Sequence, residues 1–325
     1  MGRKIILLFL MLVLGAYLMP GMASGLDYPT REIELISGYP PGSSTDHVAR
    51  LAAKFAEKYV GKPIIVVNKP GGGGSRGFAS LAASKSDGYT IGIVSQSAIL
   101  QPYLMKGVTF HYKKSFKILS QVCYTAEGVY VKKGGPWDMP FKEIVNQAKE
   151  KPNTIRAGVG GTWTASDVVR AILEDETGAK FIRVPHPAGG QELIPAILGG
   201  HLHFAIGEGS HWAPLYESGK FNVLAISTER RDPRFPKIPT LKEMGYDIIL
   251  PVTFWVGAPA GTPDAVVNFL AEAFRKGVAE EGYREGSDKA GNNAVWTGPA
   301  ESMKTMERYD EMFKKLVKRH DLKPE

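Results

Sequence analysis

The chain has 325 residues, of which 43% are hydrophobic and 22% are charged, and its formal net charge is +7. This length is sufficient for two domains that each bury a hydrophobic core. The Lys and Arg residues are scattered rather than gathered in a stripe, which excludes a nucleic-acid-binding protein. Because Cys123 is the only cysteine, an intramolecular disulfide and a lipid-modified N-terminal cysteine are excluded as well.

Residues 1–23 are typical of a secretory signal peptide. Arg3 and Lys4 precede an apolar run from residue 5 to residue 14. Small residues permit cleavage after Ala23 or after Gly25. The alternative is a membrane anchor, but the run is shorter than the ~20 residues that a spanning helix needs. We therefore predict secretion to the periplasm. Loss of Arg3 and Lys4 lowers the net charge from +7 to +5, which still favours an anionic small ligand.

After the signal peptide, short β-branched runs alternate with helical patterns, which is typical of an α/β fold with largely parallel sheets. The predicted strands are Ile33–Ser37, Ile64–Val67, Thr90–Val94, Thr154–Val159, Phe181–Val184, His203–Ile206, Val223–Ser227 and Phe254–Ala258. The first predicted helix begins near Asp46, because apolar residues from Val48 onward follow the helical spacing. The other predicted helices are Arg76–Lys85, Phe141–Glu150, Ala165–Thr177, Gln191–Leu198, His211–Ser218, Pro263–Glu280 and Glu301–Lys318.

Two extended apolar segments, 121–124 and 224–227, bracket a middle block that has its own alternation of strands and helices. Two crossings of the chain indicate a discontinuous first domain and an inserted second domain. We assign residues 26–124 and 228–325 to the first domain and residues 125–227 to the second. In such folds the ligand binds in the cleft between the domains, near the carboxyl ends of the strands.

Four loops rich in small residues follow predicted strands, at residues 39–46, 95–97, 157–167 and 185–191. Small residues before a helix leave its first backbone N–H groups open to a carboxylate or a phosphate. We therefore predict an anion site shared by the two domains, and the alternative is ordinary helix capping without a ligand. Residues 158–163 fail the dinucleotide fingerprint and the chain has no P-loop, so we expect no cofactor.

Residues 73–77 match G-x-S-x-G, the nucleophile elbow of serine hydrolases, with Ser75 as the nucleophile. The context argues against this alternative, because Pro70 and four glycines separate Ser75 from the strand that would have to lead directly into it. The histidines that could complete a triad are His186, His201, His203 and His211. We expect that the protein is not an enzyme.

A metal site is a further alternative. His201 and His203 alternate on a predicted strand, and Glu208 and His211 follow them. The His-x-His spacing is non-specific without a further spacing signature, so we expect no metal ion. We expect Cys123 to be a small buried residue.

Several motifs occur in a fixed order along nearly the whole mature chain. They are Tyr28-Pro29-Thr30-Arg31, the loop at residues 39–46, Asn68-Lys69-Pro70-Gly71, Asp87-Gly88-Tyr89-Thr90, Leu198-Gly199-Gly200, Ile238-Pro239-Thr240 and the run from Ala258 to Pro263. This order resembles the tripartite tricarboxylate transporter substrate-binding proteins, also called Bug-type extracytoplasmic solute receptors. The resemblance implies a two-domain periplasmic binding protein fold of the type II kind, with two crossover strands and the ligand in the interdomain cleft.

The resemblance also implies a function. A receptor of this kind captures a small carboxylate and delivers it to the membrane subunits of a tripartite transporter, and we expect it to be a monomer. A periplasmic sensor that signals to a membrane kinase is the alternative. In the family, backbone N–H groups of the loops that correspond to residues 39–46 and 158–167 hold the ligand's carboxylates.

We predict ligand contacts on both sides of the cleft. The predicted residues are Tyr39, Pro41, Gly42, Ser43, Ser44, Thr45, Asp46, Ser95, Gln96, Ser97, Gly160, Gly161, Thr162, Trp163, Thr164, Ser166, Asp167, His186, Ala188, Gly189, Glu208 and Phe254. Glu208 departs from the family pattern. Its carboxylate would repel a fully ionised acid unless a hydroxyl, an amine or a proton of the ligand faces it, which argues against citrate-like specificity.

Overall fold

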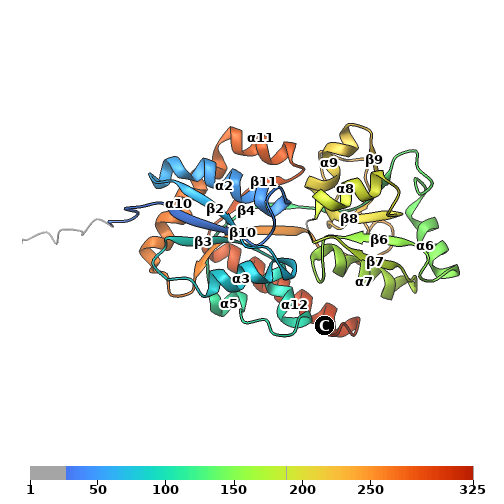
Figure 1. Cartoon of the computed structure of the whole chain (residues 1–325), viewed down its shortest axis with the longest axis horizontal. Coiled ribbons are helices and arrows are strands. Elements are labelled where there is room, and N and C mark those ends of the chain that lie inside the picture. Colours follow the sequence, from blue (N-terminus) through green and yellow to red (C-terminus); the bar gives the residue numbers. More distant parts are fainter. Residues whose placement is uncertain (1–26, 188, 325) are drawn as a thin grey trace, which may run out of the picture.

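The computed structural model describes residues 27–187 and 189–324, so the predicted signal peptide lies outside the described residues. Two separate β-sheets, each flanked by helices, lie side by side along the long axis of the molecule (Figure 1). The first sheet has the strand order β11-β4-β10-β3-β1-β2, and the second has the order β7-β6-β8-β5-β9. We call the two halves the first unit and the second unit.

The first unit combines both ends of the described chain. Its strands are β1 (Ile33–Ser37), β2 (Ile64–Asn68), β3 (Thr90–Ser95), β4 (Phe116–Thr125), β10 (Val252–Pro259) and β11 (Asn293–Thr297). Its helices are α2 (Ser44–Val60), the 3-10 turn η1 (Gly72–Gly74), α3 (Ser75–Ala82), α4 (Ser97–Leu104), α5 (Tyr112–Ser115), α10 (Asp264–Ala279), α11 (Glu281–Lys289) and α12 (Pro299–Arg319).

The second unit is built from the middle of the chain. Its strands are β5 (Glu127–Lys132), β6 (Arg156–Val159), β7 (Ile182–Pro185), β8 (Phe204–Glu208) and β9 (Phe221–Ile226). Its helices are α6 (Phe141–Glu150), α7 (Ala165–Thr177), α8 (Gly190–Leu198) and α9 (Gly209–Glu217). None of the helices within residues 27–187 and 189–324 has the length and the apolar character that crossing a membrane requires.

Helix α2 shows how the sequence produces the first unit. Val48, Ala52 and Ala56 recur at helical spacing and are buried, as an amphipathic helix requires. Gly61 ends the helix in the left-handed conformation with φ 76°. On α10, a Cβ at Gly277 would lie 2.8 Å from the backbone of α2. The glycine therefore allows the two helices to pack at close range.

Two crossings connect the units. Strand β4 leads through Ala126 directly into β5, and residues 227–251 lead from β9 back to β10. The prediction of largely parallel sheets was wrong for the strands near these crossings: β10 pairs antiparallel with both β3 and β4, and β5 pairs antiparallel with β8 and β9. A chain that leaves one unit and returns beside its own exit has to run in the opposite direction there.

The structure confirms the predicted strands, with ends that differ by at most two residues. For helices α6 and α7 it confirms both the predicted first residue and the predicted last residue. It adds α4, α5, α11, β5 and β11, and it extends the apolar segment 121–124 to the whole of β4. Helix α4 lacked the usual signals, because Pro102 lies inside it and no side chain caps its start. Helix α11 carries two glycines and few buried residues, which weakens its periodic pattern.

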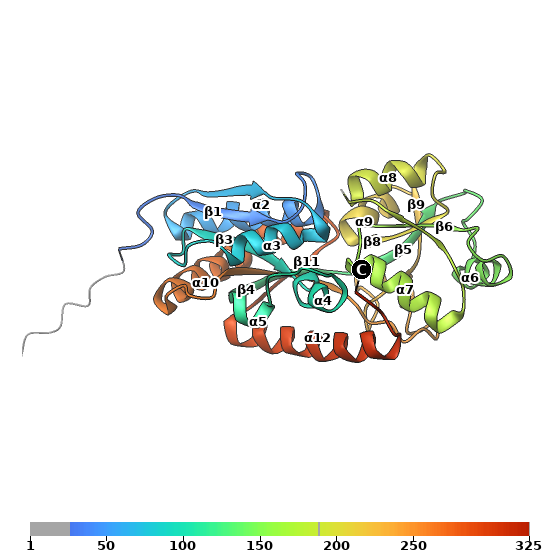
Figure 2. The ribbon, with the colours of Figure 1, turned by 60° about the horizontal axis from the view of Figure 1, so that its bottom comes forward.

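The domain boundaries stay a prediction, because residues 228–251 contact both units. Phe235 packs edge-on against Trp212 of α9, with ring centroids 5.2 Å apart, whereas Arg234 donates a hydrogen bond to the carbonyl of Asn292 in the first unit at 2.8 Å. The C-terminal helix α12 also bridges the units (Figure 2). It runs below the first unit and its end reaches α7, where His320 contacts Asp175.

Candidate ligand-binding site

A buried cavity lies between the two units, at the carboxyl ends of β3, β6 and β8 and in the loops that follow β1 and β7, which is where ligands bind in open α/β sheets. Its volume is about 30 Å³. The residues that line it are Tyr39, Ser43, Ser44, Thr45, Ser95, Gln96, Ser97, Glu127, Gly160, Thr164, Ala165, Ser166, Gly189, Gly207, Glu208, His211, Val252 and Phe254. Small hydroxyl-bearing residues dominate this set.

The loop before α2 contributes the first wall. Ser43 caps the helix by accepting a hydrogen bond from Asp46 N at 3.2 Å. The Asp46 carboxylate turns back and accepts from Gly42 N at 2.8 Å and from Arg50 Nε at 3.0 Å. These hydrogen bonds hold the pKa of Asp46 below its ordinary value despite its burial. The side chain therefore stabilises its own loop. Ser44 N and Thr45 N have no intrahelical partner and find no other partner in the described chain.

The facing loop of the second unit repeats this design. Asp167 lies in the first turn of α7 and accepts a hydrogen bond from Trp163 N at 3.0 Å. Arg170 and Arg183 each approach the Asp167 carboxylate to 2.9 Å. Trp163 has φ 51°, the left-handed conformation that Gly42 adopts in the first loop. Both loops therefore turn the first N–H groups of a helix toward the cavity, α2 from one unit and α7 from the other.

The end of β3 contributes polar groups from the first unit. The Gln96 amide oxygen accepts a hydrogen bond from Thr253 N at 2.9 Å, and its buried amide nitrogen has no partner. Ser97 begins α4 and also lines the cavity. Tyr39 donates its hydroxyl hydrogen to the carbonyl of Gly73 at 2.7 Å. Burial and the nearby Glu208 raise the pKa of Tyr39, so the phenol is neutral at pH 7.

Two carboxylic acids of the second sheet line the cavity, and Glu127 is buried whereas Glu208 is half-buried. Glu127 at the start of β5 and Glu208 at the end of β8 are direct partners in the antiparallel ladder, and one oxygen of each has no hydrogen-bond partner. Burial raises the pKa of Glu208 to about 7, against the opposing effect of the Ser44 hydroxyl. Burial is the main cause that raises the pKa of Glu127 well above its ordinary value, and the nearby Glu208 carboxyl raises it further.

No Lys or Arg is among the described residues that line the cavity. The nearest candidate cation is His211 on α9, whose Nε2 accepts a hydrogen bond from Gly190 N at 3.0 Å. Burial lowers the pKa of His211 to about 4, so this ring is neutral at pH 7. The positive potential in the cavity therefore comes from helix N-termini rather than from charged side chains.

Direct contacts between the units close the cavity. Gln191 on α8 donates a hydrogen bond to the carbonyl of Pro41 at 2.7 Å. A Cβ at Gly73 would lie 2.9 Å from the carbonyl oxygen of Thr162, so this turn also touches the opposite unit. A volume of about 30 Å³ holds only one or two water molecules. Entry of an organic acid therefore requires the units to separate.

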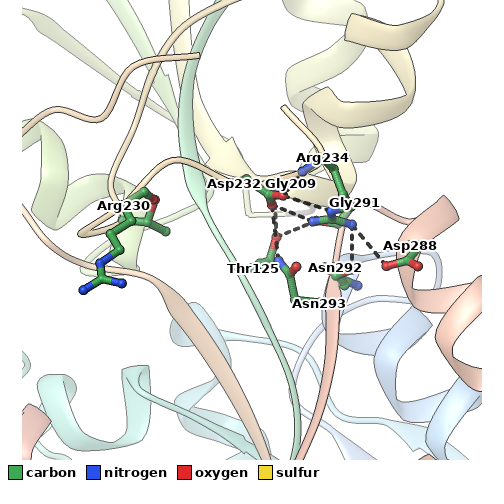
Figure 3. A network of polar contacts seen from close by, with 10 residues as sticks. Thr125, Gly209, Arg230, Asp232, Arg234, Asp288, Gly291, Asn292 and Asn293 are labelled. Carbon is green, nitrogen blue, oxygen red and sulfur yellow. Dashed lines mark hydrogen bonds and ion pairs between the residues drawn. The ribbon is translucent and has the colours of Figure 1, made fainter. Parts of the chain in front are cut away.

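A polar network joins the units beside the crossing strands (Figure 3). Thr125 donates to the carbonyl of Gly291 at 3.0 Å and accepts from Gly209 N at 3.0 Å. Arg234 pairs with Asp232 at 2.7 Å and donates to the carbonyl of Gly291 at 3.3 Å. A Cβ at Gly209 would lie 2.2 Å from the Gly291 oxygen, so the two backbones meet at a distance that only glycine allows.

The structure brings most of the predicted site residues to the cavity. Those that line it are Tyr39, Ser43, Ser44, Thr45, Ser95, Gln96, Ser97, Gly160, Thr164, Ser166, Gly189, Glu208 and Phe254. Others lie in the same loops without lining it, namely Pro41, Gly42, Asp46, Gly161, Thr162, Trp163, Asp167 and His186. Ala188 lies outside the described residues. That these residues contact a ligand stays a prediction.

Five residues that line the cavity were not predicted from the sequence, namely Glu127, Ala165, Gly207, His211 and Val252. Glu127 was the most difficult of these to find, because strand β5 itself was not predicted. A signal was present in the short apolar run from Gly128 to Val131 directly after the predicted crossing segment. Val252 belongs to β10, whose predicted start was two residues too late.

The two alternative chemistries find little support in the geometry. Ser75 begins α3 after the turn η1 rather than at the end of a strand, and no hydrogen bond within the described chain links it to a histidine. His203 lies before β8 and stacks on Trp137 with ring centroids 4.4 Å apart, at the end of the strand opposite to Glu208. The described residues contain no group of His, Cys, Asp and Glu suited to a metal ion.

Comparison with known proteins identifies the family. The family model of the tripartite tricarboxylate transporter family receptor, TctC, matches residues 48–322. The chain belongs to this family. A UPF0065 protein in the gbd 5′ region of Cupriavidus necator is 34% identical to this TctC-family chain over 275 residues, which are 84% of this chain and 82% of that protein. BugT of Bordetella pertussis is 28% identical over 257 residues, 75% of each protein.

Solved structures confirm the periplasmic binding protein fold of this TctC-family receptor. A periplasmic transporter superimposes with a TM-score of 0.85 at 27% identity and covers 91% of this chain and 99% of its own. Two structures with ligands have the same fold: a protein of R. palustris with adipate (TM-score 0.85, 22% identity, 92% and 100% covered) and MatC from Rhodopseudomonas palustris with bound malate (0.82, 20%, 89% and 100%).

Proposed function

We propose that the protein is a periplasmic receptor that binds a small carboxylate between its two units and delivers it to the membrane subunits of a tripartite transporter. The observation that carries this proposal is the pair of facing helix N-termini. Ser44 N and Thr45 N of α2 lie on one side of the cavity, and the first N–H groups of α7 lie on the other. Such groups bind carboxylates without a charged side chain.

The proposed ligand class has independent support. Related structures hold adipate and malate, and the mild positive charge of the chain favours anions. Membership in a family of periplasmic solute-binding receptors supports the proposed partner and location. We propose that the protein acts as a monomer without catalysis, since the geometry around Ser75 provides no activated nucleophile.

A binding panel tests this function. Isothermal titration of the mature protein with butyrate, succinate, adipate, malate and citrate should detect saturable binding of at least one carboxylate. The matched neutral amides should bind more weakly, because they lack the charge that helix N-termini favour. Neutral amides that bind as tightly as every carboxylate would contradict the proposal. Hydrolysis of ester analogues that is lost in Ser75→Ala would support the hydrolase instead.

A further inference from the structure

Glu127 and Glu208 form a feature that carboxylate binding does not explain. They are direct cross-strand partners on β5 and β8, so their side chains leave the same face of the sheet with Cβ atoms about 5 Å apart. Both side chains line the cavity. Glu127 is 3% exposed, and the Oε2 atoms of both residues are buried without a hydrogen-bond partner. Buried carboxyl groups in proteins are normally paired.

Among the described residues that line the cavity, no group carries a positive charge that neutralises this pair. The titratable groups that face it are Tyr39 after β1, Cys123 on β4, Tyr130 on β5 and His211 on α9. Burial raises the pKa of the two tyrosines and of the cysteine and lowers that of His211, so all four are neutral at pH 7. The charge that balances the two acids therefore has to come from bound protons or from the ligand.

We propose that the ligand carries an ammonium group as well as a carboxylate, and that the ammonium group binds between Glu127 and Glu208 while the carboxylate lies at the N-termini of α2 and α7. This inference rests on the proposed function and narrows its ligand class to amino-carboxylates. An ammonium group has three donors, enough for both unpartnered Oε2 atoms. It also supplies the positive charge that the cavity lacks.

Other functional groups fit this end of the cavity less well. A second carboxylate would be repelled by the ionised form of the pair, so its binding would require that both acids hold protons. A neutral amide can donate to one Oε2 atom, but it leaves the charge of the pair uncompensated. The ammonium group satisfies both the hydrogen-bond geometry and the charge.

Matched sets of ligands test the inference on the whole mature protein. The first set is 4-aminobutyrate, succinate and butyrate. The second is 6-aminohexanoate, adipate and hexanoate, and the third is L-alanine, malonate and propionate. In at least one set the amino acid should bind at least tenfold more tightly than both the dicarboxylate and the monocarboxylate of that set. Glu127→Gln and Glu208→Gln should each reduce this preference at least tenfold. Glu143→Gln, which changes an exposed acid on α6 at the far end of the second unit, should leave it unchanged.

The protons released or taken up give a second readout. Titrations in two buffers of different ionisation enthalpy should show proton release when the amino acid binds, because a cation lowers the pKa of both acids. A dicarboxylate should cause proton uptake. Tighter binding of dicarboxylates than of amino acids in every set, or a preference for the amino acid that survives both substitutions, would overturn the inference but leave the proposed receptor function standing. Failure of every carboxylate to bind would overturn both.

Discussion

At the scale of single residues, three acids with similar local sequence settings have different roles. Asp46 and Asp167 follow small residues near helix starts, and both turn back to bind backbone N–H groups of their own loops. Glu208 also lies at a helix start, but its side chain caps nothing and enters the cavity. The two aspartates therefore stabilise the loops that form the site, whereas one carboxyl oxygen of Glu208 has no hydrogen-bond partner.

Glu208 should make the ligand-free protein less stable as the pH rises. Its pKa is about 7 in the folded state against an ordinary 4.5, so the folded state binds the proton more strongly, and stability is lost as the pH rises from 4.5 through 7. The shift corresponds to a loss on the order of 3 kcal/mol. Glu208→Gln should therefore unfold at higher denaturant concentration than wild type at pH 8, with little difference at pH 4.5.

Urea unfolding at several pH values, followed by circular dichroism, measures this difference. Glu143→Gln serves as the control, because its side chain is exposed. A constant difference between Glu208→Gln and wild type at every pH would show that the Glu208 carboxyl does not titrate in a buried environment.

The Asp167 carboxylate should contribute more to stability than the Asp46 carboxylate. Asp167 is fully buried and pairs with Arg170 and Arg183, whereas the Arg50 partner of Asp46 is half exposed. Removing one partner of a buried charge network leaves the others uncompensated, so Asp167→Ala should lower the free energy of unfolding by about 3–5 kcal/mol. Asp46→Ala should cost clearly less in the same denaturant experiment. Equal losses would mean that loop capping, rather than the ion pairs, dominates at both positions.

At the scale of elements, the starts of α2 and α7 are the parts that we expect to bind the carboxylate. Ser44 is the first helical residue of α2, a position where proline is favoured, and the preceding Ser43 is extended with ψ 164°, as a residue before proline should be. A proline at residue 44 therefore removes one N–H group and leaves the helix intact.

Ser44→Pro should weaken carboxylate binding by about 1–3 kcal/mol through the lost donor. Ser44→Ala should cost less, because its backbone N–H group remains. Isothermal titration of both variants, with melting temperatures as a check on folding, separates the backbone donor from the hydroxyl. Equal losses in the two variants would assign the contact to the Ser44 hydroxyl.

At the scale of the whole molecule, the two units meet around the cavity and beside the two crossings of the chain. Gln191 reaches Pro41 at the mouth, Gly209 meets Gly291 near the crossing strands, and the end of α12 contacts α7 (Figure 2). Because these contacts close the cavity, we expect ligand exchange to require a hinge motion of the units.

Small-angle scattering should show this motion as a smaller radius of gyration at saturating ligand than without ligand. Gly209→Ala places a Cβ 2.2 Å from the Gly291 oxygen in the closed form. We expect this variant to keep the radius of ligand-free wild type, to contract less with ligand and to bind at least tenfold more weakly. An unchanged radius for wild type at proven saturation would contradict closure between the units.

The amino-acid sequence by itself determined most strands, most helices and the loops around the cavity, because periodicity and capping act over a few residues. It did not determine which polar residues of a loop face the cavity, since Ser, Thr and Asp suit both capping and ligand contact. Only the tertiary structure decided that β10 returns antiparallel beside β4. Only the register between β5 and β8 placed Glu127 beside Glu208, because pairing between distant strands depends on the packing of the whole unit and leaves no local signal in the chain.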